Sequence, residues 1–346
     1  MRLPSLLIAL ALPLATPSSA WDIAYDPLQP LFAPDLGDTR AALLIRDGRV
    51  VEKRYAPGYG DGNRFISWSM AKTITGMLVG ALVTDGKLQL DAPAPLNEWH
   101  RPGDPRARIT LRHLLTMSSG LRHTEVGDPI EASDTNQVLF VSGTQAMAAG
   151  AMAQPLEAAP GVRYEYSSLT SLLLAEIVTR TLTPSRDPRV RAAAYTRFAQ
   201  QRLFGPAGIR SAALEFDGAG TQIGGSLIYM SLPDWGRLGQ LLIDGKGPTG
   251  AQVIAPAWLD TMRRPAATAG NYGAQLWLNR PKAPGDPVMF PGAPPGTVSA
   301  EGHLGQHVTA VPEARLVIVR LGNTREERIN GNHRAIGAII AGVLGS

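Results

Sequence analysis

The sequence of 346 residues contains no cysteine. This absence excludes disulfide bonds, thiol catalysis and a lipid-bearing cysteine behind a leader, so stability must come from apolar burial. Lysine is scarce too, with five residues in the whole chain, and the basic residues are nearly all arginines. Because the formal net charge is only +4 and no run of five like charges occurs, the sequence does not predict nucleic-acid binding.

Long apolar runs are also missing. No segment has 18 consecutive apolar residues, so we expect no stable membrane span. Residues 1–20 combine the basic Arg2, an apolar run too short for a span, and a Ser-Ser-Ala end, which is typical of a secretory signal peptide. We expect cleavage after Ala20 and a periplasmic or secreted mature protein, with an uncleaved anchor as the alternative.

The composition is that of a globular protein, with 44% hydrophobic and 18% charged residues. A hairpin is expected over 41–55, with its turn at Arg46-Asp47-Gly48, and a surface loop over 280–296. Apolar patterns predict helices over 70–85, 109–121 (capped by Thr110), 136–153, 168–182, 190–203 and 333–343, and strands at 224–230, 272–278, 307–311 and 315–322.

Strands near both ends of the chain, with helices between them, predict an α+β fold. We expect one α/β sheet domain built from residues 21–87 and 216–346. Residues 88–215 are expected to form an inserted, mostly helical subdomain.

The stretch SWSMAKTITGMLVGALV places Lys72 in an otherwise apolar helix. Ser69 stands three residues earlier, so both side chains lie on the same helix face. Burial without a nearby carboxylate lowers the pKa of a lysine, and its amine can then take the proton of Ser69. Free N–H groups at the helix N-terminus can hold an oxyanion beside that serine.

A chance Ser-x-x-Lys is common enough that the pattern alone is weak evidence. The adjacent positions hold Trp68, Ile74 and Met77 instead of the polar side chains that a solvated lysine would have, which favours a catalytic role. A serine–lysine pair needs a second proton carrier, and Tyr166, where a loop meets a predicted helix, is the candidate. Taken alone, Tyr166 reads more readily as an interface aromatic than as a catalyst.

Other catalytic signatures are absent from the sequence. It has no Gly-x-Ser-x-Gly elbow and no Gly-rich phosphate loop. Five histidines lack the spacing of metal ligands, so structural or solvated roles are expected for them and neither a metal nor a cofactor is predicted. These are His100, His113, His123, His307 and His333.

Six motifs occur in an order that resembles the serine beta-lactamase and penicillin-binding-protein superfamily. They are Ser-Met-Ala-Lys at 69–72, DGKLQLDAP at 85–93, ITLRHLLTMSSGL at 109–121, Tyr-Ser-Ser at 166–168, GGSLIYMSLPDWGRLGQLLIDG at 224–245 and AEGHLGQHVTAVPEARLVIVRLGN at 300–323. The likeness is strongest to class C beta-lactamase-like esterases and amidases, including nylon-oligomer (aminohexanoate-dimer) hydrolases. It runs from about residue 40 to the C-terminus and implies a beta-lactamase/transpeptidase-like fold, with an antiparallel sheet flanked by helices.

The resemblance also implies roles for individual residues. Ser69 would be the nucleophile, Lys72 its base, and Tyr166 the group that relays protons to the leaving group. Ser168 takes the place of the asparagine in the Tyr-x-Asn motif of beta-lactamases, a substitution shared with the esterase and nylon-oligomer branch. There it would hydrogen-bond Lys72 or substrate.

The chain departs from the family pattern at two places. Ala300-Glu301-Gly302 stands where beta-lactamases carry Lys-Thr-Gly, and loss of that cation counsels against efficient hydrolysis of penicillin-type substrates. The N–H of His303, next to Gly302, would form the oxyanion hole with that of Ser69, with Gln306 as the alternative register. The His303 imidazole is either a rim residue or a substrate contact. Val126 lies nearest to the position of a substrate-holding tyrosine in nylon-oligomer hydrolases, which puts cleavage of such oligomers in doubt.

We therefore expect an exported serine hydrolase that acts on a small-molecule ester or amide through an acyl-enzyme on Ser69. A D-aminopeptidase, a D-carboxypeptidase or a weak beta-lactamase is a second reading. A non-catalytic periplasmic binding protein on the same scaffold is a third. The sequence predicts neither the acyl and leaving groups nor the oligomeric state.

Overall fold

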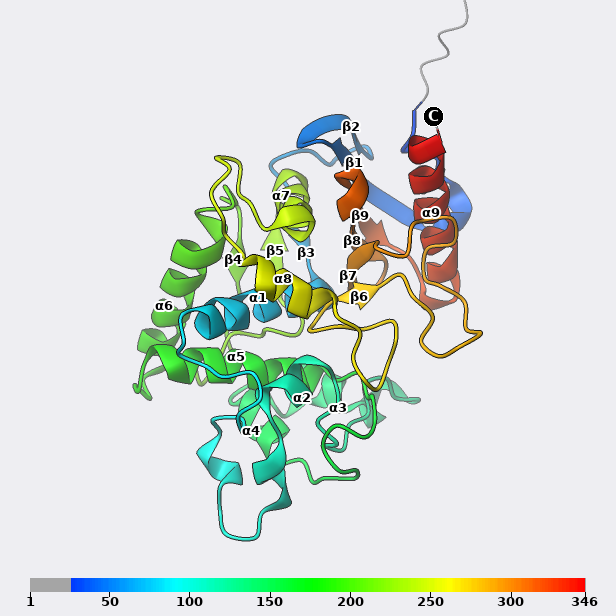
Figure 1. The fold of residues 1–346 in the computed structure, drawn as a ribbon. Coiled ribbons are helices and arrows are strands. Elements are labelled where there is room, and N and C mark those ends of the chain that lie inside the picture. The colour runs from blue at the N-terminus through cyan, green and yellow to red at the C-terminus, as the bar shows by residue number, and fades with distance from the viewer. Residues whose placement is uncertain (1–25, 346) are drawn as a thin grey trace, which may run out of the picture.

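The computed structural model describes residues 26–345, so the expected signal peptide lies outside the described residues (Figure 1). A six-stranded antiparallel sheet has the order β2-β1-β9-β8-β7-β6. Its strands are β1 (Asp38–Arg46), β2 (Arg49–Tyr55), β6 (Trp277–Leu278), β7 (Val298–Gly302), β8 (Gln306–Val311) and β9 (Leu316–Asn323). Both ends of the chain contribute strands to this sheet, as the sequence predicts. Within residues 26–345, no helix has the length and apolar character needed to cross a membrane.

Both faces of the sheet are buried at strand β1, whereas most of the edge strand β2 is exposed. Ala41, Leu43 and Ile45 belong to the large core shared with α7 (Leu232–Asp244), whereas Ala42 and Leu44 pack on the α9 side (Ile329–Gly345). Neighbouring residues of a strand point to opposite faces, so burial of both faces requires the unbroken apolar run of β1. Figure 1 shows α9 in red on one side of the sheet and α7 on the other.

The N-terminal hairpin is confirmed. β1 pairs with β2, and Arg46 lies opposite Arg49 across a two-residue turn. Asp47 and Gly48 have φ of 51° and 76°, the left-handed pair that a type I′ turn requires.

The central helix α1 (Ala71–Thr84) lies between α5 (Ser168–Leu182) and α8 (Pro256–Arg263). Gly80 permits this close packing, because a Cβ there would lie 2.0 Å from the Trp258 ring. The Trp258 indole nitrogen donates to the Gly76 carbonyl at 3.0 Å. α5 spans the predicted residues, and Ser167 caps it by accepting from the Thr170 N–H at 3.1 Å.

The middle of the chain is helical but more broken than the apolar pattern predicts. Its other helices are α2 (Leu111–Leu115), α3 (Asp134–Asn136), α4 (Met147–Met152) and α6 (Pro188–Ala199). Thr110 caps α2 as expected, but the helix ends before 121 because Met117 takes a φ of 54°. The expected helix over 136–153 breaks after a π-helical turn at 137–141, since Gly143 folds back onto Val138. The domain boundaries at 87/88 and 215/216 stay a prediction.

Two predicted strands are wrong over most of their length. Of residues 224–230 only β5 (Ile228–Met230) is extended, and it pairs with β3 (Phe65–Ile66) and β4 (Ala213–Leu214) in a small second sheet. Gly224 turns instead, packed so tightly that a Cβ would lie 2.6 Å from the Thr75 hydroxyl. In 272–278 only β6 forms, because Gln275 has a φ of 59°. The predicted strands at 307–311 and 315–322 and the terminal helix are confirmed within β8, β9 and α9.

Candidate active site

Ser69 lies in a short 3₁₀ turn, Trp68–Met70, that leads directly into α1. The turn is held by the fully buried Ser67, whose N–H donates to the Ile228 carbonyl at 2.7 Å and whose hydroxyl donates to the Ser226 carbonyl at 2.9 Å. Trp68, between the two serines, has a φ of 42°, which is unfavourable for a residue with a Cβ. Backbone strain of this kind persists where the surrounding structure holds a segment for function.

Lys72 lies in the first turn of α1, and its side-chain nitrogen makes three contacts. It lies 2.9 Å from the Ser69 Oγ, 2.8 Å from the Ser168 Oγ and 2.9 Å from the Gly225 carbonyl oxygen. Only 2% of the Lys72 residue is exposed. Ser69, Ser168 and Gly225, which come from three segments far apart in sequence, therefore meet at one nitrogen. The contact with Ser69 is the one that the Ser69–Lys72 spacing predicts.

Burial lowers the pKa of Lys72 to about 8, against the opposing effect of the Glu125 charge. The amine is thus neutral in a large fraction of molecules near neutral to mildly alkaline pH. A neutral amine 2.9 Å from a hydroxyl can accept its proton.

Tyr166 closes the site from the segment before α5. The Lys72 nitrogen lies 4.8 Å from the centre of its ring, which also packs against the rings of Tyr272 and Trp277. Burial raises the pKa of the Tyr166 hydroxyl well above its usual value, although a hydrogen bond with Ser69 acts in the opposite direction. The phenol is therefore protonated near neutrality and can donate a proton at the serine oxygen. The three predicted residues converge.

Comparison with known proteins assigns the chain to a family. Residues 36–340 match the family described as Beta-lactamase. The chain belongs to the beta-lactamase family. This confirms the resemblance seen in the motifs and the α+β fold, and it identifies the protein as a serine hydrolase of beta-lactamase-like type.

Individual relatives are distant. The 6-aminohexanoate-dimer hydrolase of Paenarthrobacter ureafaciens is 23% identical over 309 residues, covering 82% of this chain and 72% of that protein. The structure of EstCE1, a hydrolase with promiscuous acyltransferase activity, has a TM-score of 0.67 at 18% identity and covers 91% of this chain and 96% of its own. A penicillin binding protein from Bacillus halodurans has a TM-score of 0.63 at 16% identity, covering 91% and 98%.

The end of β7 lies against the turn that carries Ser69. A Cβ on Gly302 would lie 2.3 Å from the Ser67 carbonyl oxygen, so only glycine lets β7 come this close to the serine turn. His303 follows, exposed, and its ring meets the Trp68 ring edge-on at 5.4 Å between centres. The Gln306 side chain is buried and donates to the carbonyl oxygens of His303, Leu304 and Gly322. The His303 ring therefore contacts the serine turn, and the choice between the His303 and Gln306 N–H groups for the oxyanion hole stays a prediction.

A carboxylate that the sequence analysis missed lies behind the lysine of this beta-lactamase-family chain. Glu125 accepts hydrogen bonds from the Ser168 hydroxyl at 2.6 Å and from the Ser168 N–H at 2.7 Å. The expectation that Lys72 has no carboxylate nearby is therefore wrong, because Ser168 joins the two charged groups. No spacing rule points to Glu125, which lies in an irregular loop 53 positions after Lys72.

An apolar side chain of the 126–141 segment contacts the serine turn. Phe140, 53% exposed, meets the Trp68 ring edge-on at 6.5 Å between centres. Exposed apolar side chains gather in the same segment at Val126, Ile130 and Val141. Val126 is 85% exposed, and the expected absence of a tyrosine-like substrate contact at this position stays a prediction.

His307 and His333, for which the sequence predicts structural or solvated roles, meet at a second carboxylate, Glu301. Glu301, His307 and His333 bring potential metal-ligand atoms within 4.8 Å of one another. Both histidines already contact the Glu301 carboxylate, at 2.7 and 3.1 Å. Burial alone would raise the pKa of Glu301, but the charges and hydrogen bonds of the two histidines lower it to about 2. These three residues could hold a metal ion, and the buried His307 Nε2 has no hydrogen-bond partner among the described residues.

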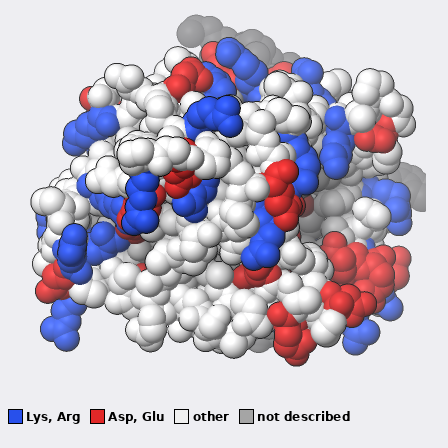
Figure 2. Space-filling view, turned by 90° about the horizontal axis from the view of Figure 1, so that it is seen from below, with Lys and Arg blue, Asp and Glu red and all other residues white. Residues whose placement is uncertain are grey.

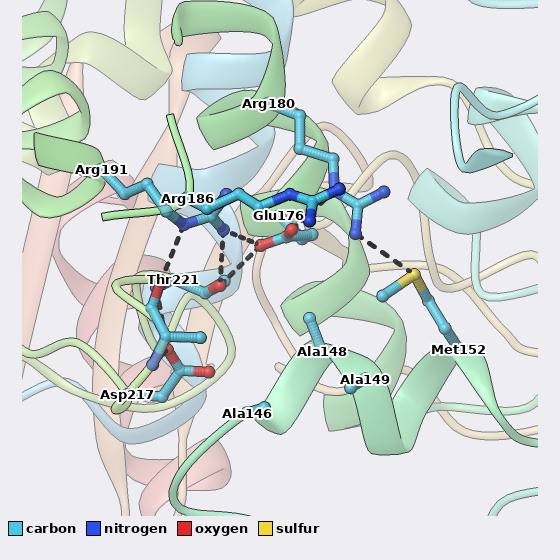
Figure 3. Close-up of a pocket in the computed structure, with 11 residues that line it drawn as sticks. Ala146, Ala148, Ala149, Met152, Glu176, Arg180, Arg186, Arg191, Asp217 and Thr221 are labelled. Atoms are coloured by element: carbon cyan, nitrogen blue, oxygen red, sulfur yellow. Dashed lines mark hydrogen bonds and ion pairs between the residues drawn. The ribbon is translucent and has the colours of Figure 1, made fainter. Parts of the chain in front are cut away.

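A third buried carboxylate, Glu176, lies on α5 in a separate cavity of about 210 Å³. It accepts from the Arg180 Nε at 2.6 Å, the Arg191 Nη2 at 2.5 Å and the Thr221 hydroxyl at 2.5 Å. Figure 3 shows the guanidinium groups of Arg180, Arg186 and Arg191 gathered around it. On the face of the molecule in Figure 2, basic and acidic side chains are interspersed and form no continuous basic surface.

Proposed function

We propose that this protein is an exported serine hydrolase that cleaves carboxylic esters, and small amides more slowly, through an acyl-enzyme on Ser69. One observation carries the proposal: the Ser69 hydroxyl lies 2.9 Å from the buried Lys72 amine and also hydrogen-bonds with the Tyr166 phenol, whose ring centre is 4.8 Å from that amine. A structural lysine would be expected beside a directly bound carboxylate, whereas this one contacts two hydroxyls and a carbonyl.

Acylation begins when the neutral Lys72 amine takes the Ser69 proton. The Ser69 oxygen then bonds to the substrate carbonyl carbon, and the carbonyl electrons move to the oxygen to give a tetrahedral oxyanion. The N–H groups of Ser69 and His303 stabilise that charge. Gly302 supports this role, because it lets the strand edge approach the serine turn.

Collapse of the intermediate breaks the bond to the leaving group. The Tyr166 phenol donates its proton to the departing oxygen or nitrogen and is reprotonated from the Lys72 ammonium, 4.8 Å from its ring. Water then attacks the acyl carbon by the same route in reverse, and the carboxylic acid and free Ser69 are released. Ser168 helps to hold Lys72 throughout.

The surroundings favour a neutral, apolar substrate. Trp68 and Phe140 border the serine, and Ala300 stands where a lysine would bind the carboxylate of a penicillin. An ester is the easier substrate because its leaving group needs less help from an acid than an amine does. The relative from Paenarthrobacter ureafaciens is an amide hydrolase by name, which keeps small amides in the range of candidates.

The direct test compares the wild type with Ser69→Ala on a short-chain nitrophenyl ester. We expect turnover to be abolished and the thermal unfolding midpoint to stay nearly unchanged, because the mutation removes one half-buried hydroxyl. Ser142→Ala, in the exposed segment near the site, is the matched control and should keep full activity. Retained turnover in Ser69→Ala would refute the assignment.

Two probes separate the alternatives. Stable labelling by a fluorescent penicillin would favour a D-amino-acid peptidase or weak beta-lactamase over an esterase. A fluorophosphonate that fails to label Ser69 would instead favour a non-catalytic binding protein. Export is tested by N-terminal sequencing of the mature protein, which should begin at Trp21.

A further inference from the structure

The Glu125 carboxylate is the most heavily hydrogen-bonded acid of the site. Besides the two bonds from Ser168, it contacts the His123 Nε2 at 2.6 Å and the Thr135 hydroxyl at 3.0 Å. Burial alone would raise the pKa of Glu125, but the bond with His123 and the charge of Lys72 lower it to about 2. Glu125 is therefore ionised throughout the range in which the enzyme would work.

An ionised carboxylate can only accept hydrogen bonds. The Ser168 hydroxyl, 2.6 Å from it, must therefore donate its one proton to Glu125. The lone pairs of the Ser168 oxygen are left for Lys72, 2.8 Å away. The Gly225 carbonyl, 2.9 Å from the same nitrogen, is also an acceptor only.

These two acceptors occupy two of the positions around the Lys72 nitrogen. A neutral amine has two N–H bonds and one lone pair, and both N–H bonds are needed for Ser168 and Gly225. The remaining direction leads to the Ser69 Oγ at 2.9 Å. The lone pair of the neutral amine is then aimed at the hydroxyl that it must deprotonate.

We propose that Glu125 is a positioning residue, which acts through Ser168 to fix the orientation of the Lys72 amine toward Ser69. The inference rests on the proposed function. Without the carboxylate, the Ser168 hydroxyl could donate to the lysine instead, and the lone pair would then point away from Ser69. Part of the base's contribution, which is typically about 10²–10⁴-fold, would be lost.

Other charged and titratable groups near this network must be considered in any pH test. The loop that carries Glu125 also brings His123, whose Nδ1 lies 4.0 Å from Asp134. Tyr164 and Tyr166 come from the segment before α5, and Glu301 comes from β7. The charges of Glu125 and Glu301 both raise the pKa of the Tyr166 hydroxyl. Among the described residues, Glu125 is the charge that opposes the effect of burial on Lys72.

The test is Glu125→Gln, which keeps the shape but can present either an oxygen or an NH₂ group to Ser168. We expect kcat/KM for the nitrophenyl ester to fall about 10- to 100-fold with KM nearly unchanged, since only the orientation of the base is lost. The part of the pH profile in which activity rises with pH should move about one pH unit lower. Removal of the negative charge disfavours the Lys72 ammonium and so lowers the pKa of Lys72. Glu131→Gln, an exposed acid six residues further along the same segment, should change neither property.

A purely structural Glu125 would give a different result. Glu125→Gln would then lower the unfolding temperature and move the pH limb through the lost charge, but the folded enzyme would keep the full kcat/KM on the alkaline plateau, and that outcome overturns the proposal. Ser168→Ala supplies a second test that does not depend on the glutamine variant folding. It should reduce kcat to a similar extent, and in the double variant the two losses should not add. Additive losses, or full activity in Ser168→Ala, would also overturn the proposal.

Failure of the proposed function is distinguishable from these outcomes. If the wild type neither turns over an ester nor reacts with a fluorophosphonate at Ser69, the hydrolase itself is in question. If the wild type is active and Glu125→Gln keeps its full rate on the alkaline plateau, only the positioning role falls.

Discussion

Glu125 and Glu176 are both enclosed carboxylates near α5, but they differ in how they contact the neighbouring cation. Glu176 is bound directly by Arg180 and Arg191, at 2.6 and 2.5 Å. Glu125 reaches Lys72 only through the Ser168 hydroxyl. Arginine stays protonated at every physiological pH, so the Glu176 cluster is a fixed ion pair. A lysine held one hydroxyl away from its carboxylate can still lose its proton, which is the property that a base requires.

The largest effect is expected from removing that property. Lys72→Arg keeps the positive charge but cannot be deprotonated, so ester hydrolysis should fall by about 10³–10⁴-fold. The comparison variant is Lys87→Arg, an exposed lysine just beyond α1, which should retain full activity. Steady-state kinetics on folded protein, with circular dichroism to establish folding, provides the measurement. An active Lys72→Arg would show that the lysine is not the base.

At the other carboxylate the expected loss is in stability. Glu176→Gln leaves Arg191, with 9% of its side chain exposed, without a charged partner, and should cost about 3–5 kcal/mol of unfolding free energy. The turnover of molecules that remain folded should not change. Urea denaturation and active-site titration measure the two quantities separately. Glu98→Gln removes the 42% exposed partner of Arg180 and should cost only about 0–1 kcal/mol.

A smaller effect comes from pH. Neutral Lys72 is the active form, and burial lowers the pKa of Lys72 to about 8, so activity is lost as the pH falls below that value. Between pH 8 and pH 6 the rate should drop roughly 50-fold, since the neutral fraction falls tenfold for each pH unit below the pKa. The kcat/KM of the ester, measured from pH 5.5 to 9.5, checks this. A flat profile would contradict an unprotonated lysine as the required form.

The smallest effect is expected at the apolar rim. Phe140→Ser removes exposed apolar surface beside Trp68 and should raise KM for an aromatic ester about three- to tenfold, with kcat little changed. Val50→Ser provides the control, because Val50 is similarly exposed on β2 at the opposite edge of the sheet from β6. An unchanged KM would exclude this rim from substrate binding.

The sequence predicts the regular parts of this molecule well, for reasons visible in particular elements. α5 carries a continuous apolar pattern and a serine cap, so its limits at residues 168 and 182 can be read locally. β8 and β9 are mostly apolar because both faces of the sheet are covered at these strands. Their runs of apolar residues therefore predict buried strands from the sequence. Ser69 and Lys72 lie one helical turn apart, so their contact also follows from local geometry.

Features that depend on distant contacts escape such reasoning. The break near Gly143 arises because its backbone folds against Val138, and the pattern of apolar residues continues across it. The strand expected at 224–230 becomes a turn at Gly224 and Gly225, where one carbonyl is needed for Lys72. Glu125 reaches the site from an irregular loop, so its position is set by the tertiary fold and no sequence spacing records it.

Direct titration of Lys72 tests the central claim most closely. With five lysines in the chain, ¹³C-lysine labelling gives a simple NMR spectrum, and the signal missing from Lys72→Arg identifies the residue. We expect that signal to titrate near pH 8 in the free enzyme. A Lys72 signal that stays in the ammonium form up to pH 10 would contradict the account.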